Sequence, residues 1–107
     1  MNIQIFGRNK CFDTKKAQRY FKERRVKFQY VDVDRYGMSR GELTAVKNAV
    51  GIAAMSDAPE VAYLAYDGDK LEELFQRPEL LKTPLVRNGR QATVGYCPDV
   101  WKGWEST

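Results

Sequence analysis

The stretch Ile3–Arg25, IQIFGRNKCFDTKKAQRYFKERR, decides the fold, because it passes from a strand pattern to a helix pattern at a glycine and a cysteine. Residues 2–6 place apolar side chains among polar ones in the way that is typical of a short strand, which we expect to end at Gly7. Cys11 therefore lies where the first strand gives way to the first helix. Its position raises the question whether its thiol fills space or reacts.

A helix follows the cysteine, since Asp13 or Thr14 can cap it and apolar residues recur at helical spacing up to about Arg25. The apolar stripe consists of Ala17, Tyr20 and Phe21. Residues 27–34, KFQYVDVD, are rich in β-branched and aromatic side chains and predict a second strand. A strand, a helix and a strand in so short a stretch predict a βαβ unit with parallel strands and a right-handed crossover.

The middle of the chain is predicted to be helical. Ser39, with Glu42 three residues later, forms the reciprocal pair that begins a helix, and Gly51 is expected to end it. Two further helical pieces are expected at residues 59–66 and 70–76, separated by the sequence DGD. A short turn at PELL leads out of this region.

Two strands and a helix are predicted at the end of the chain. The strands of TPLVRNGRQATVGY, residues 83–96, surround Asn88-Gly89, two residues that tolerate the positive φ of a type I′ turn. Pro98 begins a short last helix that carries Val100. Large aromatic side chains of the middle and the end are interpreted as core or rim packing: Tyr63, Tyr66, Trp101 and Trp104.

Length and composition indicate one soluble globular domain. The chain has 107 residues, of which 43% are hydrophobic and 30% charged, enough to bury a core without disulfides or a structural metal. We find no leader pattern and no apolar run long enough to cross a bilayer, so we expect a cytoplasmic protein without membrane association. In that compartment two cysteines are expected to remain thiols.

The absence of histidine excludes several classes of chemistry. Serine or cysteine nucleophiles paired with a histidine base, and zinc held by histidine, are ruled out. The two cysteines are too few for a structural zinc site, and the carboxylates show no ligand spacing, so no metal is expected. A reactive cysteine in this chain would need another means of activation.

Positive charge is concentrated at the start of the chain. Residues 1–30 carry nine Lys and Arg against two acidic residues, whereas residues 31–107 carry nine against twelve. This charge could form a surface for nucleic acid or simply a solvated helix face. The solvated face is the favoured interpretation, because Tyr20 and Phe21 are expected in the core and not on a surface that stacks on bases. No direct readout of nucleic acid is therefore expected. The charge would also suit an anionic thiol such as glutathione or an acidic protein surface.

The cysteine at the junction of strand and helix, the segment TPLV, the hairpin and the sequence VGY make the chain resemble the arsenate-reductase-like (ArsC/Spx) family of thioredoxin-fold proteins. The resemblance implies an α/β, thioredoxin-like (glutaredoxin-like) fold with a mixed four-stranded sheet. It implies one domain over residues 1–107, with a helical insertion at about residues 38–82 between the βαβ and ββα halves. It also implies a cis Pro84 facing Cys11, and a Thr83 backbone that can pair with a substrate.

The chain departs from this family at positions that carry its chemistry. The C-x-x-C motif of the Spx branch is here Cys11-Phe12-Asp13-Thr14, so a disulfide switch within that motif is impossible. Arsenate reductases place arginines before the proline and before the last helix, where this chain has Thr83 and Cys97. The sequence therefore does not favour arsenate as the substrate.

Cys11 can react only as a thiolate, so its surroundings decide its role. The helix N-terminus, Arg8 and Lys10 would lower the pKa of the thiol, and the Thr14 hydroxyl could donate a hydrogen bond to the sulfur, whereas Asp13 would oppose ionisation. The alternative is that Cys11 is a small buried apolar residue. With the resemblance, Cys11 and Thr14 are the catalytic candidates. The candidates for substrate binding are Arg8, Lys10, Thr83 and Pro84.

Cys97 follows the last predicted strand, and the family layout would bring it near Cys11. One hypothesis is that Cys97 resolves oxidised Cys11 by forming a disulfide, in place of the missing second cysteine of the motif. The alternative is that Cys97 is an incidental cysteine.

Three functions remain open at this point. The resemblance implies a thiol-dependent oxidoreductase without organic cofactor, which would draw on glutathione or on a glutaredoxin-like protein. The second reading is an Spx-like regulator that binds RNA polymerase without catalysis. The third is a member of the same fold with no redox role.

Overall fold

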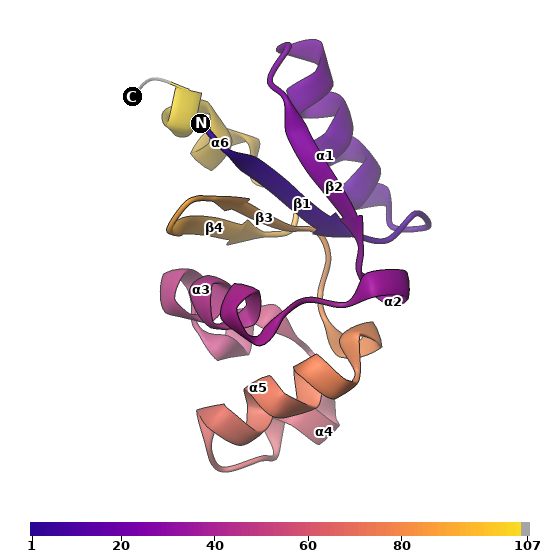
Figure 1. The fold of residues 1–107 in the computed structure, drawn as a ribbon, viewed down its shortest axis with the longest axis vertical. Helices are drawn as coiled ribbons and strands as arrows, with labels where there is room; N and C mark the ends of the chain where they lie inside the picture. The colour runs from indigo at the N-terminus through magenta and orange to yellow at the C-terminus, as the bar shows by residue number, and fades with distance from the viewer. Residues whose placement is uncertain (106–107) are drawn as a thin grey trace.

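The computed structural model of the protein describes residues 1–105, which form a mixed sheet of four strands in the order β2-β1-β3-β4 (Figure 1). The strands are β1 (Ile3–Gly7), β2 (Phe28–Asp32), β3 (Leu85–Asn88) and β4 (Gln91–Val94). β1 pairs in parallel with β2 and antiparallel with β3, and β3 pairs antiparallel with β4. The predicted βαβ and ββα halves thus join through β1 and β3.

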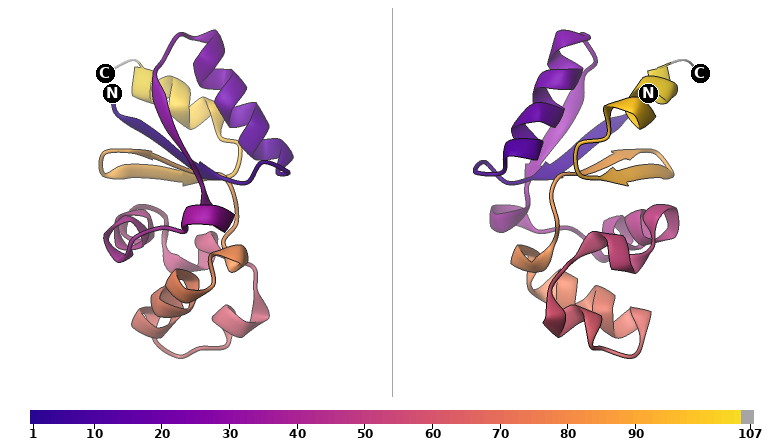
Figure 2. Two further views of the ribbon diagram at one scale, coloured as in Figure 1. Left: turned by 45° about the vertical axis from the view of Figure 1, so that its right-hand side comes forward. Right: turned by 180° about the vertical axis from the view of Figure 1, so that it is seen from behind.

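Helices cover both faces of the sheet. They are α1 (Phe12–Glu23), α2 (Val33–Tyr36), α3 (Arg40–Val50), α4 (Pro59–Ala62), α5 (Asp67–Gln76) and α6 (Pro98–Glu105). α1 and α6 lie on one face, α3 lies on the other, and α4 and α5 lie beyond α3 (Figures 1 and 2). Among residues 1–105, none of the helices is both long and apolar enough to cross a membrane.

Each face of the sheet has its own apolar core, because helices exclude water from both sides. On the α1 side, Ile5 and Val86 contribute to one core, and on the α3 side Phe6 and Leu85 contribute to the other. The predicted stripe of α1 is confirmed, since its three members are buried in the first core: Ala17, Tyr20 and Phe21. Burial on both sides explains why β1 ends in successive buried residues instead of a strict alternation.

The capping prediction for α3 is confirmed. The Ser39 hydroxyl accepts a hydrogen bond from the backbone N–H of Glu42 at 3.1 Å, and the Glu42 carboxylate accepts one from the backbone N–H of Ser39 at 2.9 Å. Gly51 follows the last turn with a φ of 85°, a left-handed value that favours glycine. Both ends of this helix are therefore set by local sequence.

Two predicted boundaries in the first half are wrong. The residue that caps α1 is Cys11, so Asp13 and Thr14 lie inside the first turn. The second strand does not extend through residue 34, because the Asp32 carboxylate accepts the backbone N–H of Asp34 at 3.1 Å and Val33 begins the short helix α2.

The boundaries of the helical middle also differ from the prediction. α4 ends at Ala62, and α5 begins at Asp67, so the sequence DGD forms the first turn of α5 and does not separate two helices. Tyr63 and Tyr66 are 82% and 72% exposed, so the interpretation of these two side chains as packing residues is wrong. The corresponding interpretation of Trp101 and Trp104 is confirmed by their burial.

The predicted hairpin forms, but its turn is displaced by one residue. Asn88 pairs with Gln91, so the two turn residues are Gly89 and Arg90. Gly89 has a φ of 61° and neither Asn88 nor Arg90 has a positive φ, as in a type II′ turn and not the predicted type I′ turn. The amide of Asn88 donates to the side-chain oxygen of Gln91 at 3.3 Å, which ties the strand ends together.

Candidate functional site

Cys11 lies at the N-terminus of α1 in a partly exposed position. Its backbone is extended (φ −84°, ψ 121°), and its carbonyl oxygen accepts the N–H of Lys15 at 3.2 Å, which makes Cys11 the N-cap residue. The N–H of Cys11 donates to the carbonyl oxygen of Arg8 at 3.0 Å, so the loop from β1 to α1 is a closed turn. The thiol is therefore presented where unpaired N–H groups of the helix converge.

Thr14 lies directly beneath this turn and is fully buried. Its hydroxyl oxygen accepts the backbone N–H of Arg8 at 3.3 Å, which fixes the loop above it. A Cβ at Gly7 would lie only 2.3 Å from Cγ2 of Thr14. A glycine at position 7 thus allows Thr14 to pack against the end of β1, and the two residues together fix the position of the loop that carries Cys11.

The Thr83-Pro84 peptide bond is cis and faces Cys11, as the resemblance implied. Cys11 Sγ lies 3.5 Å from the carbonyl oxygen of Thr83, to which the thiol donates. The carbonyl oxygen of Pro84 accepts the N–H of Gly95 at 2.8 Å, so the segment after β4 is anchored to the same place. The cysteine loop and the segment before β3 therefore meet at the sulfur atom, and the segment after β4 is bonded to the residue that follows Thr83.

The surroundings of Cys11 lower the pKa of its thiol. Burial has the largest effect and raises this pKa, but several hydrogen bonds to the sulfur together outweigh it. These come from the side chains of Thr14 and Thr83 and from the backbone N–H groups of Thr14 and Asp13. The stabilisation of the thiolate thus comes from the two threonines and the first turn of α1.

Arg8 does not point freely into solvent but clamps the segment that leads to Pro84. Its guanidinium donates to the carbonyl oxygens of Pro78 and Leu81, each at 2.6 Å, and to the Thr83 hydroxyl at 3.4 Å. Its Nε forms an ion pair of 2.9 Å with Asp34 in α2. Arg8 therefore lies at the predicted site, but its donors are directed to the protein itself.

Lys10 lies exposed on the same loop. It lines a depression together with the residues around the Arg8–Asp34 ion pair: Arg8, Asn9, Asp32 and Asp34. Because no ion pair holds Lys10 within residues 1–105, its ammonium group is available to an approaching anion.

Cys97 lies between β4 and α6 and is a free thiol, as is Cys11. Its sulfur donates to the carbonyl oxygen of Val94 at 3.4 Å. Burial raises the pKa of Cys97, a hydrogen bond from Thr93 lowers it by less, and the nearby charge of Asp13 raises it further. The raised pKa favours the neutral thiol form of Cys97.

The sequence interpretation missed two exposed aromatic residues beside the first turns of α1. Phe12 is 79% exposed directly after Cys11, and the ammonium of Lys15 lies 5.9 Å from its ring centroid. Tyr96 is 41% exposed, with the ammonium of Lys16 at 5.5 Å from its ring centroid. The sequence does indicate that Phe12 is exposed, since this residue falls outside the apolar stripe of α1.

The described part of the chain shows no cluster of three or more Cys, Asp or Glu side chains that could hold a metal ion. The site consists instead of one thiol, two threonines, backbone groups and a cis-proline. Residues 3–52, which include β1, α1, β2 and α3, match the glutaredoxin family model. The topology and the cysteine at the start of α1 thus define a thioredoxin-like (glutaredoxin-like) fold.

Several solved structures similar to this chain over nearly its full length are ArsC-related proteins. An ArsC family related protein from Bacteroides fragilis superposes with a TM-score of 0.84 at 16% identity, covering 96% of this chain and 97% of that one. Arsenate reductase from Vibrio cholerae gives 0.80 at 18% identity, covering 94% of each chain. The protein SACOL0876 from Staphylococcus aureus gives 0.78 at 23% identity, covering 94% of this chain and 96% of that one.

No curated protein sequence matches the chain significantly. The predicted resemblance to ArsC-related proteins is confirmed for the fold, including the helical insertion between the two halves of the sheet. At these identities the likeness concerns architecture, so the chemistry has to be argued from the residues around Cys11.

Proposed function

We propose that the protein is a thiol-dependent oxidoreductase in which Cys11 attacks a sulfur atom of a disulfide substrate. The observation that supports this most strongly is the setting of the sulfur. It is partly exposed at the N-cap of α1, it lies 3.5 Å from the Thr83 carbonyl, and its pKa is lowered despite burial. A structural cysteine buried among apolar groups would have a raised pKa.

The proposed reaction has two balanced steps. The Cys11 thiolate attacks one sulfur of the substrate, a new S–S bond forms between protein and substrate, and the other substrate sulfur leaves as a thiolate that takes a proton from water. An external thiol then attacks the substrate sulfur of this mixed disulfide and releases Cys11 as a thiolate. The net result is that the substrate disulfide is exchanged for a mixed disulfide and a free thiol.

The backbone before Pro84 has a defined part in this proposal. In the resting protein the carbonyl oxygen of Thr83 accepts the Cys11 thiol hydrogen. Once the thiol is ionised, that oxygen is free to accept an N–H from the substrate backbone, while the Thr14 and Thr83 hydroxyls donate to the sulfur. Substrate and thiolate would then be aligned by the same residue, which would favour in-line attack.

The external thiol is proposed because position 14 is threonine and not a second cysteine. Glutathione or a glutaredoxin-like protein of the cytoplasm would supply it. Cys97 is an internal alternative, but its raised pKa leaves little thiolate at neutral pH, so its attack on oxidised Cys11 would be slow without a change in its surroundings.

A disulfide is favoured over arsenate for a structural reason. An oxyanion needs free guanidinium or amide donors at the sulfur, and Arg8, the arginine of the cysteine loop, directs its donors to Pro78, Leu81, Thr83 and Asp34. The chain has Thr83 and Cys97 where arsenate reductases place arginines.

Thiol titration tests this proposal directly. Alkylation by iodoacetamide would be followed against pH in the Cys97→Ser variant, in which Cys11 is the remaining thiol. We expect half-maximal reactivity at a lower pH than for a free peptide thiol, and reduction of a mixed disulfide with glutathione present. The proposal is wrong if Cys11 reacts like a free peptide thiol at pH 7 and if Cys11→Ser reduces disulfides as fast as the parent protein.

A non-catalytic role as a regulator that binds RNA polymerase is the second candidate. The observation that favours it is the exposure of Tyr63 and Tyr66 on the helical insertion, because large exposed aromatic side chains are typical of protein-binding surfaces. Capture of RNA polymerase from a bacterial lysate would favour this function if Cys11→Ser captured it equally and Tyr63→Ser with Tyr66→Ser did not.

A further inference from the structure

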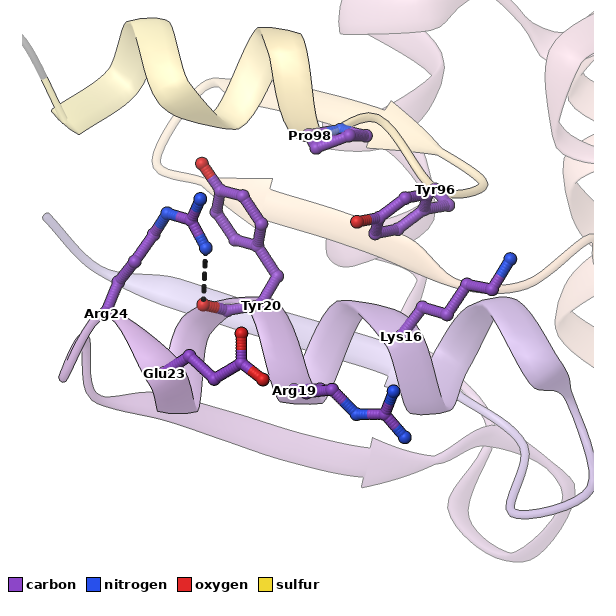
Figure 3. Close-up of a pocket in the computed structure, with 7 residues that line it drawn as sticks. All are labelled: Lys16, Arg19, Tyr20, Glu23, Arg24, Tyr96 and Pro98. Atoms are coloured by element: carbon purple, nitrogen blue, oxygen red, sulfur yellow. Dashed lines mark hydrogen bonds between the residues drawn. The ribbon is translucent and has the colours of Figure 1, made fainter.

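We infer that a groove between α1 and the segment leading to α6 binds an acidic peptide segment of a protein substrate and thereby directs that substrate's disulfide to Cys11. This inference rests on the proposed function and deepens it, since it names the class of substrate. The groove, called here the α1 groove, has a volume of about 440 Å³ (Figure 3). Its lining residues are Lys16, Arg19, Tyr20, Glu23, Arg24, Tyr96 and Pro98.

The α1 groove carries more positive than negative charge, although Arg24 also pairs with Glu105 at 3.8 Å. Three cationic side chains line it against the single carboxylate of Glu23. Within residues 1–105, neither Lys16 nor Arg19 has a carboxylate within ion-pair distance. Figure 3 shows both side chains leaving neighbouring turns of α1, with Lys16 directed to the Tyr96 side and Arg19 to the other side of the helix. An anionic ligand is therefore the complement of this surface.

The third cation is held in place before any ligand arrives. The guanidinium of Arg24 lies 3.7 Å from the ring centroid of Tyr20, and its Nη1 donates to the carbonyl oxygen of Tyr20 at 3.4 Å. Its Nε lies 3.8 Å from a carboxylate oxygen of Glu105, which is too long for a strong hydrogen bond. Arg24 is thus oriented by an aromatic ring and keeps donor capacity for a ligand.

The α1 groove begins about 7.5 Å along the α1 axis from Cys11, because Lys16 follows Cys11 by five residues. Its Tyr96 end follows Gly95, whose N–H donates to the carbonyl oxygen of Pro84 opposite Cys11. From Lys16 to Arg24 the helix rises about 12 Å, the length of three to four residues of an extended peptide. A substrate whose cysteine lies at Cys11 would therefore place acidic residues within a few positions of that cysteine along the groove.

The shape of the site favours a peptide over a small anion. The cations are spread along two turns of α1 and do not converge on one point, so a single phosphate or carboxylate would meet at most one or two of them. The exposed aromatic residues Tyr96 and Phe12 flank the start of α1 and offer apolar contacts to neighbouring side chains of a peptide. Their paired lysines, Lys16 and Lys15, combine these contacts with positive charge.

Peptides with an activated disulfide test this inference in the Cys97→Ser protein. Three peptides of equal length would carry one cysteine as its 2-pyridyl disulfide, flanked by acidic, neutral or basic residues. Attack of Cys11 on the peptide sulfur forms the protein–peptide disulfide and releases pyridine-2-thione, whose absorbance gives the rate. We expect the acidic peptide to react about tenfold faster than the neutral one at low salt, with the advantage reduced at high salt.

Two double variants with matched charge reversals distinguish the effect of the α1 groove on the rate from the effect of the net charge of the protein. Lys16→Glu with Arg19→Glu should abolish the preference for the acidic peptide, measured as the ratio of the rates with the acidic and the neutral peptide. Lys22→Glu with Lys27→Glu makes the same change in net charge on exposed residues outside the groove and should retain the preference. Loss of the preference in both double variants would overturn the inference, as would equal rates for the three peptides with the parent protein.

Two further outcomes distinguish a failure of this inference from a failure of the proposed function. If the 2-pyridyl disulfide of glutathione shows the same dependence on Lys16 and Arg19 as the acidic peptide, the α1 groove binds a small anion and the inference is overturned. If Cys11 reacts no faster than free cysteine with the neutral peptide, the proposed function fails instead. Binding of a fluorescent acidic peptide without cysteine to Cys11→Ser, measured by anisotropy, then still decides whether the groove binds acidic segments.

Discussion

Arg8 and Leu81 are joined by a hydrogen bond of 2.6 Å between the guanidinium and a main-chain carbonyl oxygen, across 73 positions of sequence. The same guanidinium reaches Pro78 and Asp34, so one side chain holds α2, just before the helical insertion, and the end of that insertion next to the cysteine loop. The cis Pro84 that faces Cys11 follows this clamped segment by only a few residues. Assembly of the thiol site therefore depends on a residue that need not touch the substrate.

Replacement of Arg8 by methionine, which keeps much of the side-chain volume, should lower the free energy of unfolding by about 2–4 kcal/mol. The reason is that two partly buried carbonyl oxygens lose a charged donor. Urea denaturation followed by circular dichroism measures the change. Arg40→Met is the matched control, because Arg40 pairs with Glu72 on the surface with a side chain that is 64% exposed, and it should lower the free energy of unfolding clearly less than Arg8→Met does. Equal losses in the two variants would contradict the role given to Arg8.

Gly7→Ala should destabilise the protein by about 1–3 kcal/mol, because the new methyl group would overlap the side chain of Thr14 at the end of a buried strand. Thr14→Ser in the same chain removes Cγ2, the atom nearest to the added carbon at 2.3 Å, and should recover part of the loss. Thermal or urea unfolding of the four proteins in this cycle gives the coupling energy. Additive effects of the two substitutions would show that the contact is not the cause.

Thr14→Val preserves the shape of the threonine but removes its hydroxyl, so it should raise the pKa of Cys11. The rate of alkylation at pH 7 should then fall severalfold and approach the rate of the parent protein at pH values where both thiols are ionised. Thr14→Ser retains a hydroxyl and should stay close to the parent protein. A pH profile of Thr14→Val that coincides with that of the parent protein would exclude the proposed hydrogen bond.

The lowered pKa of Cys11 also makes a prediction about stability. A thiol whose folded-state pKa lies below its unfolded-state pKa releases its proton more readily in the folded protein. Its contribution to the free energy of unfolding is therefore fully present above the unfolded-state pKa and is lost as the pH falls through the folded-state pKa. The stability of the parent protein relative to Cys11→Ser should rise with pH in that window. A difference that stays constant or falls would contradict the stabilised thiolate.

Thr93→Val should cost about 1–3 kcal/mol, since the buried N–H of Trp101 would lose its acceptor. That N–H donates to the Thr93 hydroxyl at 2.8 Å and joins β4 to α6. Thr93→Ser keeps the hydroxyl oxygen and should lower the free energy of unfolding by less, mainly because the methyl group is missing. Tryptophan fluorescence during urea denaturation measures both variants, and equal losses would argue that the methyl group and not the hydrogen bond matters.

Local sequence predicted those parts of the fold that local contacts determine. The reciprocal bonds of Ser39 and Glu42 lie within one helical turn, so the residue types alone are sufficient to locate the start of α3. The stripe of Ala17, Tyr20 and Phe21 likewise follows from helical spacing. The position of Cys11 between a strand and a helix could be read for the same reason.

The remaining differences come from choices that local sequence leaves open. Glycine at position 89 fits either place in a two-residue turn, and the pairing of β3 with β1 and β4 decides which one it takes. Asp32 can end a strand or cap a helix, and Tyr63 and Tyr66 can pack or face solvent. The role of Arg8 as a clamp could not be foreseen, because its hydrogen-bond partners lie at positions 78, 81 and 83.

The Arg8 clamp has a consequence for protein engineering. Arg8 bonds to Asp34 before the helical middle and to Pro78 and Leu81 at its end. The segment between these contacts is therefore a candidate for replacement, because its two ends are already held together. Shorter or foreign helices could replace the residues between Asp34 and Pro78 without changing the surroundings of Cys11. The replacement would have to keep the carbonyl groups of Pro78 and Leu81 that accept from Arg8, and it would have to cover the apolar face of the sheet that α3 covers now.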